Sequence, residues 1–291
     1  MPDFVSARVP GESSEDRTTA PVRLWTVESG LVGTERLDAV AAEEPLEIRV
    51  RGQCVAVTMR TPGNDEELAV GFLLTEGLIR SRIEILEVEH CRQGEAAREQ
   101  NVLNVFVAPS VAIDFERLTR HVYITSSCGL CGKTSIESVH QHFPPIHSKL
   151  AVAAEALYQL PTRLRAAQET FQRTGGLHAA GIFNGQGDLL VLREDVGRHN
   201  AVDKVIGFGC LEGRLPFDSH ILLVSGRASF EIMQKALAAR IPIVAAVSAP
   251  SSLAVEFARE SGQTLVGFLR GQSMNIYAAP ERVGTTPKPC S

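Results

Sequence analysis

The chain has 291 residues, of which 44% are hydrophobic and 22% are charged, an ordinary globular composition with room for one large core or two unequal domains. The formal net charge is −5, from 34 acidic and 29 basic residues, so the surface as a whole is not that of a nucleic-acid-binding protein. No apolar run is long enough to span a bilayer, so no membrane segment is predicted.

Residues 1–21 are polar and lack the apolar core of a secretory signal peptide, so we expect a flexible lead-in and a cytoplasmic protein. Four of the six cysteines are scattered singly, and Cys54 and Cys210 are interpreted as small hydrophobes. Cys128 and Cys131 form a C-x-x-C pair. In a reducing cytoplasm such a pair is more often reactive or metal-binding than a structural disulfide.

The first part of the chain is predicted to be rich in strands, with one strong helix. Asn64, with Glu67 three residues on, makes a capping-box arrangement that opens an apolar-periodic helix reaching Ile79. The polar segment 93–100 is predicted to be a loop. Strands are predicted at 46–50 and 54–59, as a hairpin, and at 83–89 and 102–107.

The rest of the chain alternates strands and helices. Pro161 is expected to start a helix that Gly175 and Gly176 end. Because runs such as 243–247 are apolar on both faces, they fit strands buried between helices, and the prediction is an α/β fold with helices on both sheet faces. Strands are predicted at 122–125, 178–184, 189–193, 221–224, 243–247 and 264–269, and helices from 133 and at 151–158, 162–173, 229–239 and 252–260.

Ligands of such sheets bind beyond the carboxyl ends of the strands. Three predicted loops meet that description, at 126–132, 225–227 and 248–251. The first carries the cysteine pair between a strand end and a helix start, where unpaired N–H groups and Lys133 favour the thiolate. A thiolate is the form that attacks the sulfur of a disulfide or a persulfide.

Other interpretations of the cysteine pair stay open. His142 and His147 lie at roughly zinc-finger spacing, although Pro144 and Pro145 between them prevent their presentation on one helix. A thioredoxin-like redox pair also fits a strand-to-helix turn. The tripeptide 132–134 is the tail of a phosphate-binding loop without its first glycine, and two plain buried thiols are the simplest alternative.

Together with four further blocks, the cysteine loop resembles the FdhD family of formate dehydrogenase accessory sulfurtransferases. Each block alone is a modest signal, but five of them in order are highly specific. They are Ser126–Gly132, Thr174–Gly181, Arg193–Lys204, Ser225–Arg227, and Val266–Gly271 with Tyr277.

The resemblance implies a sulfur carrier that accepts persulfide sulfur from a cysteine desulfurase on Cys128, with Cys131 as helper. The sulfur would pass to the molybdenum (or tungsten) bis-guanine-dinucleotide cofactor before that cofactor enters the formate dehydrogenase apoenzyme. GDP is the expected mimic of the cofactor, and no structural metal is expected. By position, the cofactor-binding stretch is Phe268, Leu269, Arg270, Gly271, Gln272 and Ser273. Relatives often carry further basic or polar groups after the phenylalanine, whereas this chain keeps one cation, Arg270.

The resemblance also implies a homodimer with a fold similar to cytidine deaminases. We expect a smaller strand-rich α+β domain at 22–118, a three-layer deaminase-like α/β domain at 119–282 with the cysteine loop and cofactor site, and a flexible tail at 283–291. Deaminase chemistry itself is not expected. It requires H-x-E, and none of the eight histidines is followed two residues on by glutamate. A fold can be shared without the reaction.

The remaining polar clusters have two interpretations each. His178 is either a satisfied core histidine or a pocket residue. The charges of 193–204 form either a solvated face or a site in which Arg198 and His199 meet phosphate oxygens and Asp195 holds a base or ribose. Three residues before a predicted helix, Ser225, Gly226 and Arg227, form either a structural turn or a pyrophosphate seat. Phe268 either stacks on a purine or fills the core.

An alternative function of another class is a zinc-stabilised nucleotide-binding adaptor, which would deliver the cofactor without sulfur chemistry. Zinc bound in stoichiometric amount and lost with Cys131 would distinguish it from a sulfur carrier.

Overall fold

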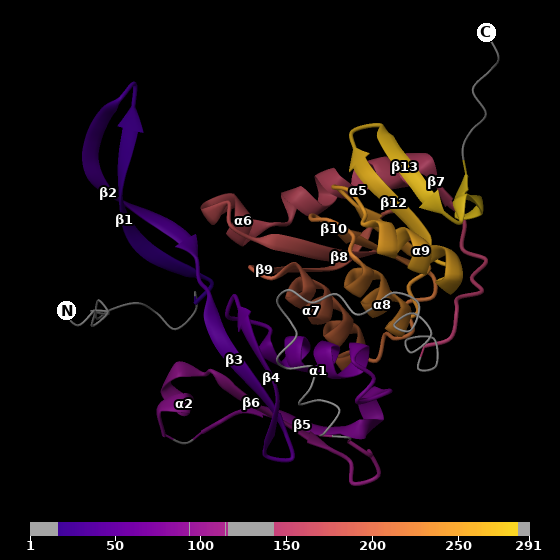
Figure 1. Ribbon diagram of the computed structural model, residues 1–291, viewed down its shortest axis with the longest axis horizontal. Coiled ribbons are helices and arrows are strands. Elements are labelled where there is room, and N and C mark those ends of the chain that lie inside the picture. Colours follow the sequence, from indigo (N-terminus) through magenta and orange to yellow (C-terminus); the bar gives the residue numbers. More distant parts are fainter. Residues whose placement is uncertain (1–16, 93, 114, 116–142, 285–291) are drawn as a thin grey trace.

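The computed structural model describes residues 17–92, 94–113, 115 and 143–284 (Figure 1). The predicted strand 122–125, the loop with Cys128 and Cys131, and the helix from 133 lie outside the described residues. So do Cys290 and most of the predicted tail. Within the described part, no helix has the length and apolar character needed to cross a membrane.

A six-stranded sheet forms the centre of the larger part of the molecule. The strand order is β13-β12-β11-β10-β8-β9, with β10, β11 and β12 parallel and the other neighbours antiparallel. The strands are β8 (His178–Asn184), β9 (Leu189–Asp195), β10 (His220–Val224), β11 (Ile243–Ala246), β12 (Thr264–Arg270) and β13 (Ser273–Ala278).

Helices cover both faces of this sheet, as the apolar runs predict. In β10, Ile221 and Leu223 pack in the cluster that includes α5, whereas Leu222 and Val224 pack in the cluster that includes the helices of the other face. The result is a three-layer α/β arrangement. The layers are α5 (Ala154–Ala166) on one side, and α7 (Arg198–Leu211), α8 (Phe230–Ala238) and α9 (Ser252–Ser261) on the other.

A four-stranded sheet packs on the outer side of α7 through helix α1 (Asp65–Thr75) (Figure 1). Its order is β4-β3-β6-β5, and the predicted hairpin is confirmed as its first two strands. The strands are β3 (Glu44–Val50), β4 (Gln53–Arg60), β5 (Ile85–His90), preceded by the short helix η1 (Arg82–Glu84), and β6 (Val102–Val107).

Helices α1 and α7 approach so closely that their backbones touch. A Cβ on Gly71 would lie 1.9 Å from the carbonyl oxygen of Asp203, and one on Gly207 would lie 1.8 Å from that of Glu67. Glycine is therefore required at both positions of the crossing. The hydrophobic core runs without interruption from the four-stranded sheet through this crossing to the six-stranded sheet, so the predicted parts 22–118 and 119–282 share one core.

The described part of the chain starts with a long antiparallel hairpin, β1 (Thr19–Glu28) and β2 (Leu31–Ala41), which projects from the body (Figure 1). Residues 19–21, which were predicted as part of the lead-in, belong to β1, because Thr19 pairs with Ala41. At the other end, β14 (Val283–Gly284) pairs with β7 (Val152–Ala153) after the short helix η2 (Pro280–Arg282). The first residues of the predicted tail are therefore a strand.

Three local predictions are wrong. Segment 93–100 contains a short helix, α2 (Gly94–Glu99), rather than only a loop. Pro161 lies inside α5 instead of starting a helix, and α6 (Glu169–Thr174) follows separately. Leu157, Leu160 and Leu164 are at most 1% exposed, so their burial along one face keeps α5 continuous through the proline. Asn64 stands at the N-cap of α1, but it adopts φ 56° and its side chain makes no cap bond.

Candidate functional site

The strand registers bring four of the five sequence blocks to one edge of the six-stranded sheet. His178, the first residue of β8, pairs with Asp195, the last of β9. Val224, the last residue of β10, pairs with Ala180 on one side and with Ala246, the last of β11, on the other. The carboxyl ends of the parallel strands therefore meet the start of β8 and the end of β9, as expected for a ligand-binding edge.

Hydrogen bonds tie the loops at this edge into one unit. After β10, Ala228 accepts a bond from the Ser251 N–H at 3.0 Å and forms a bridge with Pro250. At the end of β12, the Phe268 N–H donates to the Ser248 carbonyl at 3.1 Å, and Arg270 Nε donates to the Val247 carbonyl at 2.9 Å. The loops predicted at 225–227 and 248–251 and the C-terminal stretch are thus neighbours.

Asp195 is the buried centre of this edge. Its carboxylate is fully buried, and Oδ2 lies 2.7 Å from Lys204 Nζ and accepts from the Thr61 N–H at 3.2 Å. Oδ1 accepts from the Gly197 N–H at 2.8 Å and from Asn200 Nδ2 at 2.9 Å. With both oxygens directed at the chain's own donors, Asp195 is placed to hold the turn into α7 rather than to contact a base or ribose.

Most other charges of the 193–204 block are also paired inside the molecule, so a solvated face is the wrong interpretation of them. Arg193 forms a two-bond ion pair with Glu67, at 2.5 and 2.6 Å. Glu194 accepts the N–H groups of Thr170 and Phe171 in the first turn of α6, at 2.9 and 2.8 Å. The Asp203 carboxylate lies 2.9 Å from Lys235 Nζ and is 3% exposed. These pairings leave Arg198 and His199, the first two residues of α7, for a ligand.

Arg198 and His178 both lie close to Gly226. A Cβ on Gly226 would be 3.3 Å from His178 Nδ1 and 3.9 Å from Arg198 Cδ, so the glycine allows the imidazole to approach the loop. The Nε of Arg198 is buried and finds no hydrogen-bond partner among the described residues. Burial, followed by the charge of Arg198, lowers the pKa of His178. The Arg198 guanidinium therefore lies beside an imidazole that is neutral at neutral pH.

His199 has two partners that the sequence did not single out. Its Nε2 lies 3.3 Å from Ser229 Oγ and 3.9 Å from Glu231 Oε2, both at the start of α8. Burial, and then the charges of Arg198 and Lys235, lower the pKa of His199 to about 4. At neutral pH the ring is a neutral hydrogen-bonding group. The sequence feature that could have indicated these partners is the polar start of the helix predicted from 229, because Ser229 and Glu231 both follow the 225–227 loop directly.

In the loop predicted at Ser225–Arg227, one residue bonds to the neighbouring strand and another is exposed to solvent. The Oγ of Ser225 accepts the Ala179 N–H at 2.9 Å, and its own N–H donates to the Ala179 carbonyl, so Ser225 joins β8 to β10. Arg227 is exposed. Helices α7 and α8 begin at this edge. The N-cap of α7 is Gly197, which has no side chain, whereas in the first turn of α8 the Glu231 carboxylate accepts its own backbone N–H. Free N–H groups at helix starts, with a guanidinium nearby, suit phosphate oxygens.

Of the predicted cofactor-binding stretch 268–273, some residues are exposed at the surface and one is buried in the core. Phe268 is 39% exposed, with φ 52°, at an irregularity in the β12–β13 register, and the Arg270 guanidinium lies 5.9 Å from its ring centroid. Leu269 is fully buried in the core beside α5, so it cannot reach a ligand at the surface. The exposed residues Gly271, Gln272 and Ser273 form the turn of this hairpin and the start of β13.

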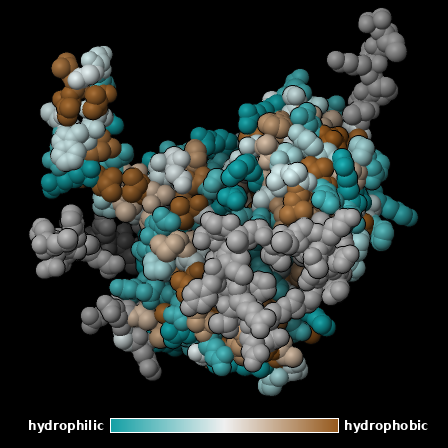
Figure 2. Space-filling model, in the orientation of Figure 1, coloured by the Kyte–Doolittle hydropathy of each residue, from teal (hydrophilic) through white to brown (hydrophobic). Residues whose placement is uncertain are grey.

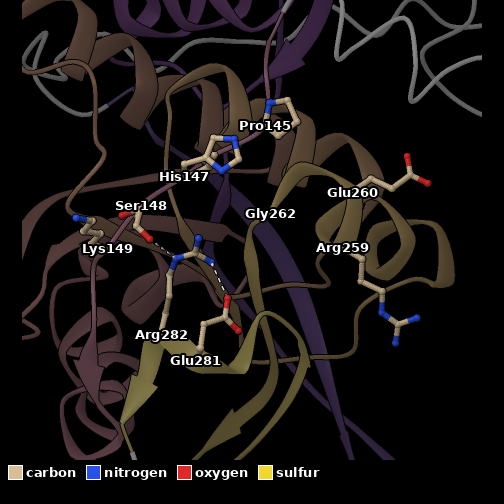
Figure 3. Close-up of a pocket in the computed structure, with 10 residues that line it drawn as sticks. Pro145, His147, Ser148, Lys149, Arg259, Glu260, Gly262, Glu281 and Arg282 are labelled. Carbon is tan, nitrogen blue, oxygen red and sulfur yellow. Dashed lines mark hydrogen bonds and ion pairs between the residues drawn. The ribbon is translucent and has the colours of Figure 1, made fainter.

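A shallow hollow of about 550 Å³ lies elsewhere, against the residues that precede β12 (Figure 3). Its buried Arg282 points toward Ser148 and Glu281, and its guanidinium donates to the Ser148 carbonyl and the Thr264 hydroxyl. The chain's own acceptors therefore occupy this arginine. The hollow is separate from the edge that the sequence blocks form.

The cysteine pair falls outside the described residues, so the structure places neither Cys128 nor Cys131. In the part that is described, no group of three or more histidine, cysteine or acidic residues could hold a metal ion. Cys210 is buried, as predicted, whereas Cys54 is exposed on the outer surface of its sheet. Cys91 is partly exposed.

Comparison with known proteins identifies the family. The FdhD/NarQ family model matches residues 41–284, which is most of the chain. The chain belongs to the FdhD/NarQ family. A protein of Streptomyces avermitilis named sulfur carrier protein FdhD is 50% identical over 276 residues, covering 92% of this chain and 96% of that protein. A protein of the same name from Mycolicibacterium paratuberculosis is 54% identical over 253 residues, covering 86% and 93%.

A solved structure supports the same assignment. The crystal structure of a protein from Desulfotalea psychrophila, assigned as a formate dehydrogenase accessory protein, superposes with a TM-score of 0.72 at 27% identity. The match covers 91% of this chain and 99% of that one. The mixed α/β fold is thus that of an FdhD-family protein, and the likeness to cytidine deaminases stays a prediction.

The low pKa of His199 predicts an acid-sensitive fold. In the unfolded chain this ring takes up a proton near pH 6.5, whereas the folded protein resists protonation down to about pH 4. The unfolded state therefore binds more protons in that range, and stability falls as the pH drops from 6.5 to 4. In His199→Gln, the loss of urea resistance over the same range should be smaller than in the wild type. An equal loss in both proteins would contradict the assignment.

Proposed function

We propose that this protein carries sulfane sulfur as a persulfide on Cys128 and delivers it to the molybdenum bis-guanine-dinucleotide cofactor for formate dehydrogenase. The names of its relatives support the sulfur-carrier role, and the name of the structural neighbour supports the link to formate dehydrogenase. The main structural support is the convergence of Arg198, His178, Gly226 and Phe268 at one sheet edge.

The residues at this sheet edge suit a nucleoside diphosphate. The buried Arg198 Nε has no hydrogen-bond partner among the described residues, and α7 starts beside it after a glycine N-cap, so N–H groups of its first turn are available at the same place. Because hydrogen bonds between a guanidinium and phosphate are charge-assisted, one such residue supplies much of the affinity. Phe268 offers an exposed ring for stacking on a base, with Arg270 beside it. His178 and the neutral His199 supply hydrogen bonds without further charge.

The sulfur chemistry needs only thiolates. The Cys128 thiolate attacks the terminal sulfur of a desulfurase persulfide, a new S–S bond forms, and the desulfurase cysteine leaves as a thiolate. The persulfide on Cys128 is then anionic near neutral pH and can be transferred without a strong base. On transfer to the cofactor, which is the substrate, the S–S bond breaks, Cys128 leaves as a thiolate, and the metal provides the electron pair that makes the sulfur a sulfide ligand. Positioning supplies most of the rate.

In this proposal Asp195 and Ser225 position the site, and Leu269 supports it from the core. Cys131 either shares the sulfur or assists its release. The partners are a cysteine desulfurase, the formate dehydrogenase apoenzyme and a second copy of the chain, and the compartment is the cytoplasm. Neither nucleic acid nor a membrane is a partner.

Sulfur loading tests the assignment of the carrier. The purified protein is incubated with a cysteine desulfurase and cysteine, and its intact mass is measured. The wild type should gain the mass of one or more sulfur atoms, and Cys128→Ala should gain none, because the attacking thiolate is absent. Cys131→Ala is measured in parallel.

Cys54→Ala is the matched control, because it removes an exposed thiol that does not belong to the C-x-x-C pair and should load like the wild type. Sulfur retained by Cys128→Ala would contradict the proposal. Failure of the wild type to load, together with stoichiometric zinc, would favour the adaptor function instead.

GDP binding tests the sheet edge independently of sulfur. Charge-assisted bonds to a phosphate are worth about 1.5–3 kcal/mol each, so Arg198→Ala should weaken GDP binding by roughly tenfold or more in calorimetry. Arg259→Ala removes an exposed arginine at the hollow of Figure 3 and should leave the affinity unchanged. Equal affinities for the wild type and Arg198→Ala would place the nucleotide elsewhere.

A further inference from the structure

Among the described residues, the contacts that hold hairpin β1–β2, residues 19–41, to the body lie near its base. There the Ala42 N–H donates to the Thr18 carbonyl, Arg173 of α6 donates to the Thr18 hydroxyl at 3.3 Å, and Arg17 pairs with Glu44 at 2.6 Å. Beyond these contacts the two strands extend away from the rest of the chain (Figure 1). A two-stranded ribbon alone is marginally stable in water, so a hairpin of this length needs a surface to pack on.

One face of the hairpin is apolar and open. In the register of the two strands, Trp25 is opposite Glu35, Val27 is opposite Val32, and Arg23 is opposite Leu37, so these six side chains share a face. We call them the arm face. Its four apolar side chains are exposed by 59% at Trp25, 64% at Val27, 69% at Val32 and 73% at Leu37. Figure 2 shows the hydrophobic colour gathered on the projecting hairpin. Contiguous exposed apolar surface of this kind marks an interaction site.

The charge balance of hairpin β1–β2 indicates which class of partner it suits. The hairpin carries Arg23 and Arg36 against Glu28, Glu35 and Asp38, so it has no excess of positive charge. That balance does not suit a phosphate backbone or an anionic membrane surface. An apolar centre with charges of both signs at its margin is the composition of a protein interface.

The arrangement of these charges matches the arm face to itself. Four of these side chains form a quadrilateral, in which Arg23 and Glu35 occupy one diagonal and Trp25 and Leu37 the other. Within the hairpin, Arg23 Nη1 lies 3.4 Å from Glu35 Oε1. A two-fold axis along the Trp25–Leu37 diagonal would place each Arg23 over Glu35 of a second copy, and Trp25 and Leu37 over their counterparts. Crossed strands of this kind are one of the two common ways in which sheets stack. A symmetric dimer requires such self-complementarity.

We propose that the arm face is the surface through which two copies of this chain associate. This surface is where the second copy named in the proposed function would bind, and the proposal does not depend on sulfur transfer. It places the interface on a projecting arm, away from the sheet edge that holds Arg198 and His199. The hairpin is thereby covered, and each arm is stabilised by the other.

Charge reversal provides the sharpest test, with mass measured by light scattering after size exclusion. Arg23→Glu places two glutamates over each other in a symmetric pair, and Glu35→Arg places two arginines over each other. Each variant alone should be at least tenfold weaker in self-association than the wild type. Mixed in equal amounts, the two variants should form a heterodimer, because every contact then joins opposite charges. The exposed Arg23–Glu35 pair within one hairpin contributes little to folding, so both variants should fold.

An apolar variant and a control complete the test. The double variant Trp25→Glu with Leu37→Glu should be monomeric, whereas Ile83→Glu should stay dimeric. Ile83 is 86% exposed on the body, away from the arm. Circular dichroism confirms that each variant is folded. A monomeric wild type, a dimer that survives the double variant, or single variants that fail to pair when mixed would each overturn the proposal. The persulfide measurement stays informative in every case.

Discussion

The candidate site depends on the buried carboxylate of Asp195. It neutralises Lys204 at 2.7 Å, accepts the Gly197 N–H at the start of α7, and reaches Thr61 at the end of the four-stranded sheet. Removing one partner of such a buried pair leaves an uncompensated charge, at a cost of about 3–5 kcal/mol. One interaction therefore joins the smaller sheet to the turn that presents Arg198. The two halves of the chain form one frame, with the glycine crossing of α1 and α7 behind it.

The chemistry of the sheet edge depends on which charged side chains are not paired with other residues of the protein. Arg193, Glu194, Asp203 and Lys204 are satisfied within the protein, so Arg198 is the cation of that block available for a ligand. Burial keeps the neighbouring imidazoles neutral, which limits the positive charge of the site. A site with a buried guanidinium, neutral imidazoles and an exposed aromatic ring is suited to holding a nucleotide, and in the proposed function the Cys128 thiol carries the sulfur.

Sequence patterns predicted the α/β class, most strands and the edge at which the motifs meet, because buried strands and glycine-rich loops leave strong local signals. They did not separate ligand-facing from structural residues. Asp195 and Arg198 stand three positions apart in one charged block, and only tertiary pairing decides that the first is internal. Leu269 follows Phe268 directly, yet alternation along β12 sends it to the core. Pro161 predicted a helix start, and packing of the surrounding leucines overrode it. The projecting hairpin gave no sign in the sequence that it would lie apart from the body.

The central prediction is that sulfur carried by Cys128 reaches a cofactor held at this edge. The most direct measurement loads the protein with heavy-isotope sulfur, adds the isolated bis-guanine-dinucleotide cofactor, and follows the label by mass spectrometry of both components. We predict that the label leaves Cys128 and appears in the cofactor, and that transfer is strongly reduced in loaded Arg198→Ala. Label that stays on the wild-type protein, or that moves equally well from Arg198→Ala, would contradict the account.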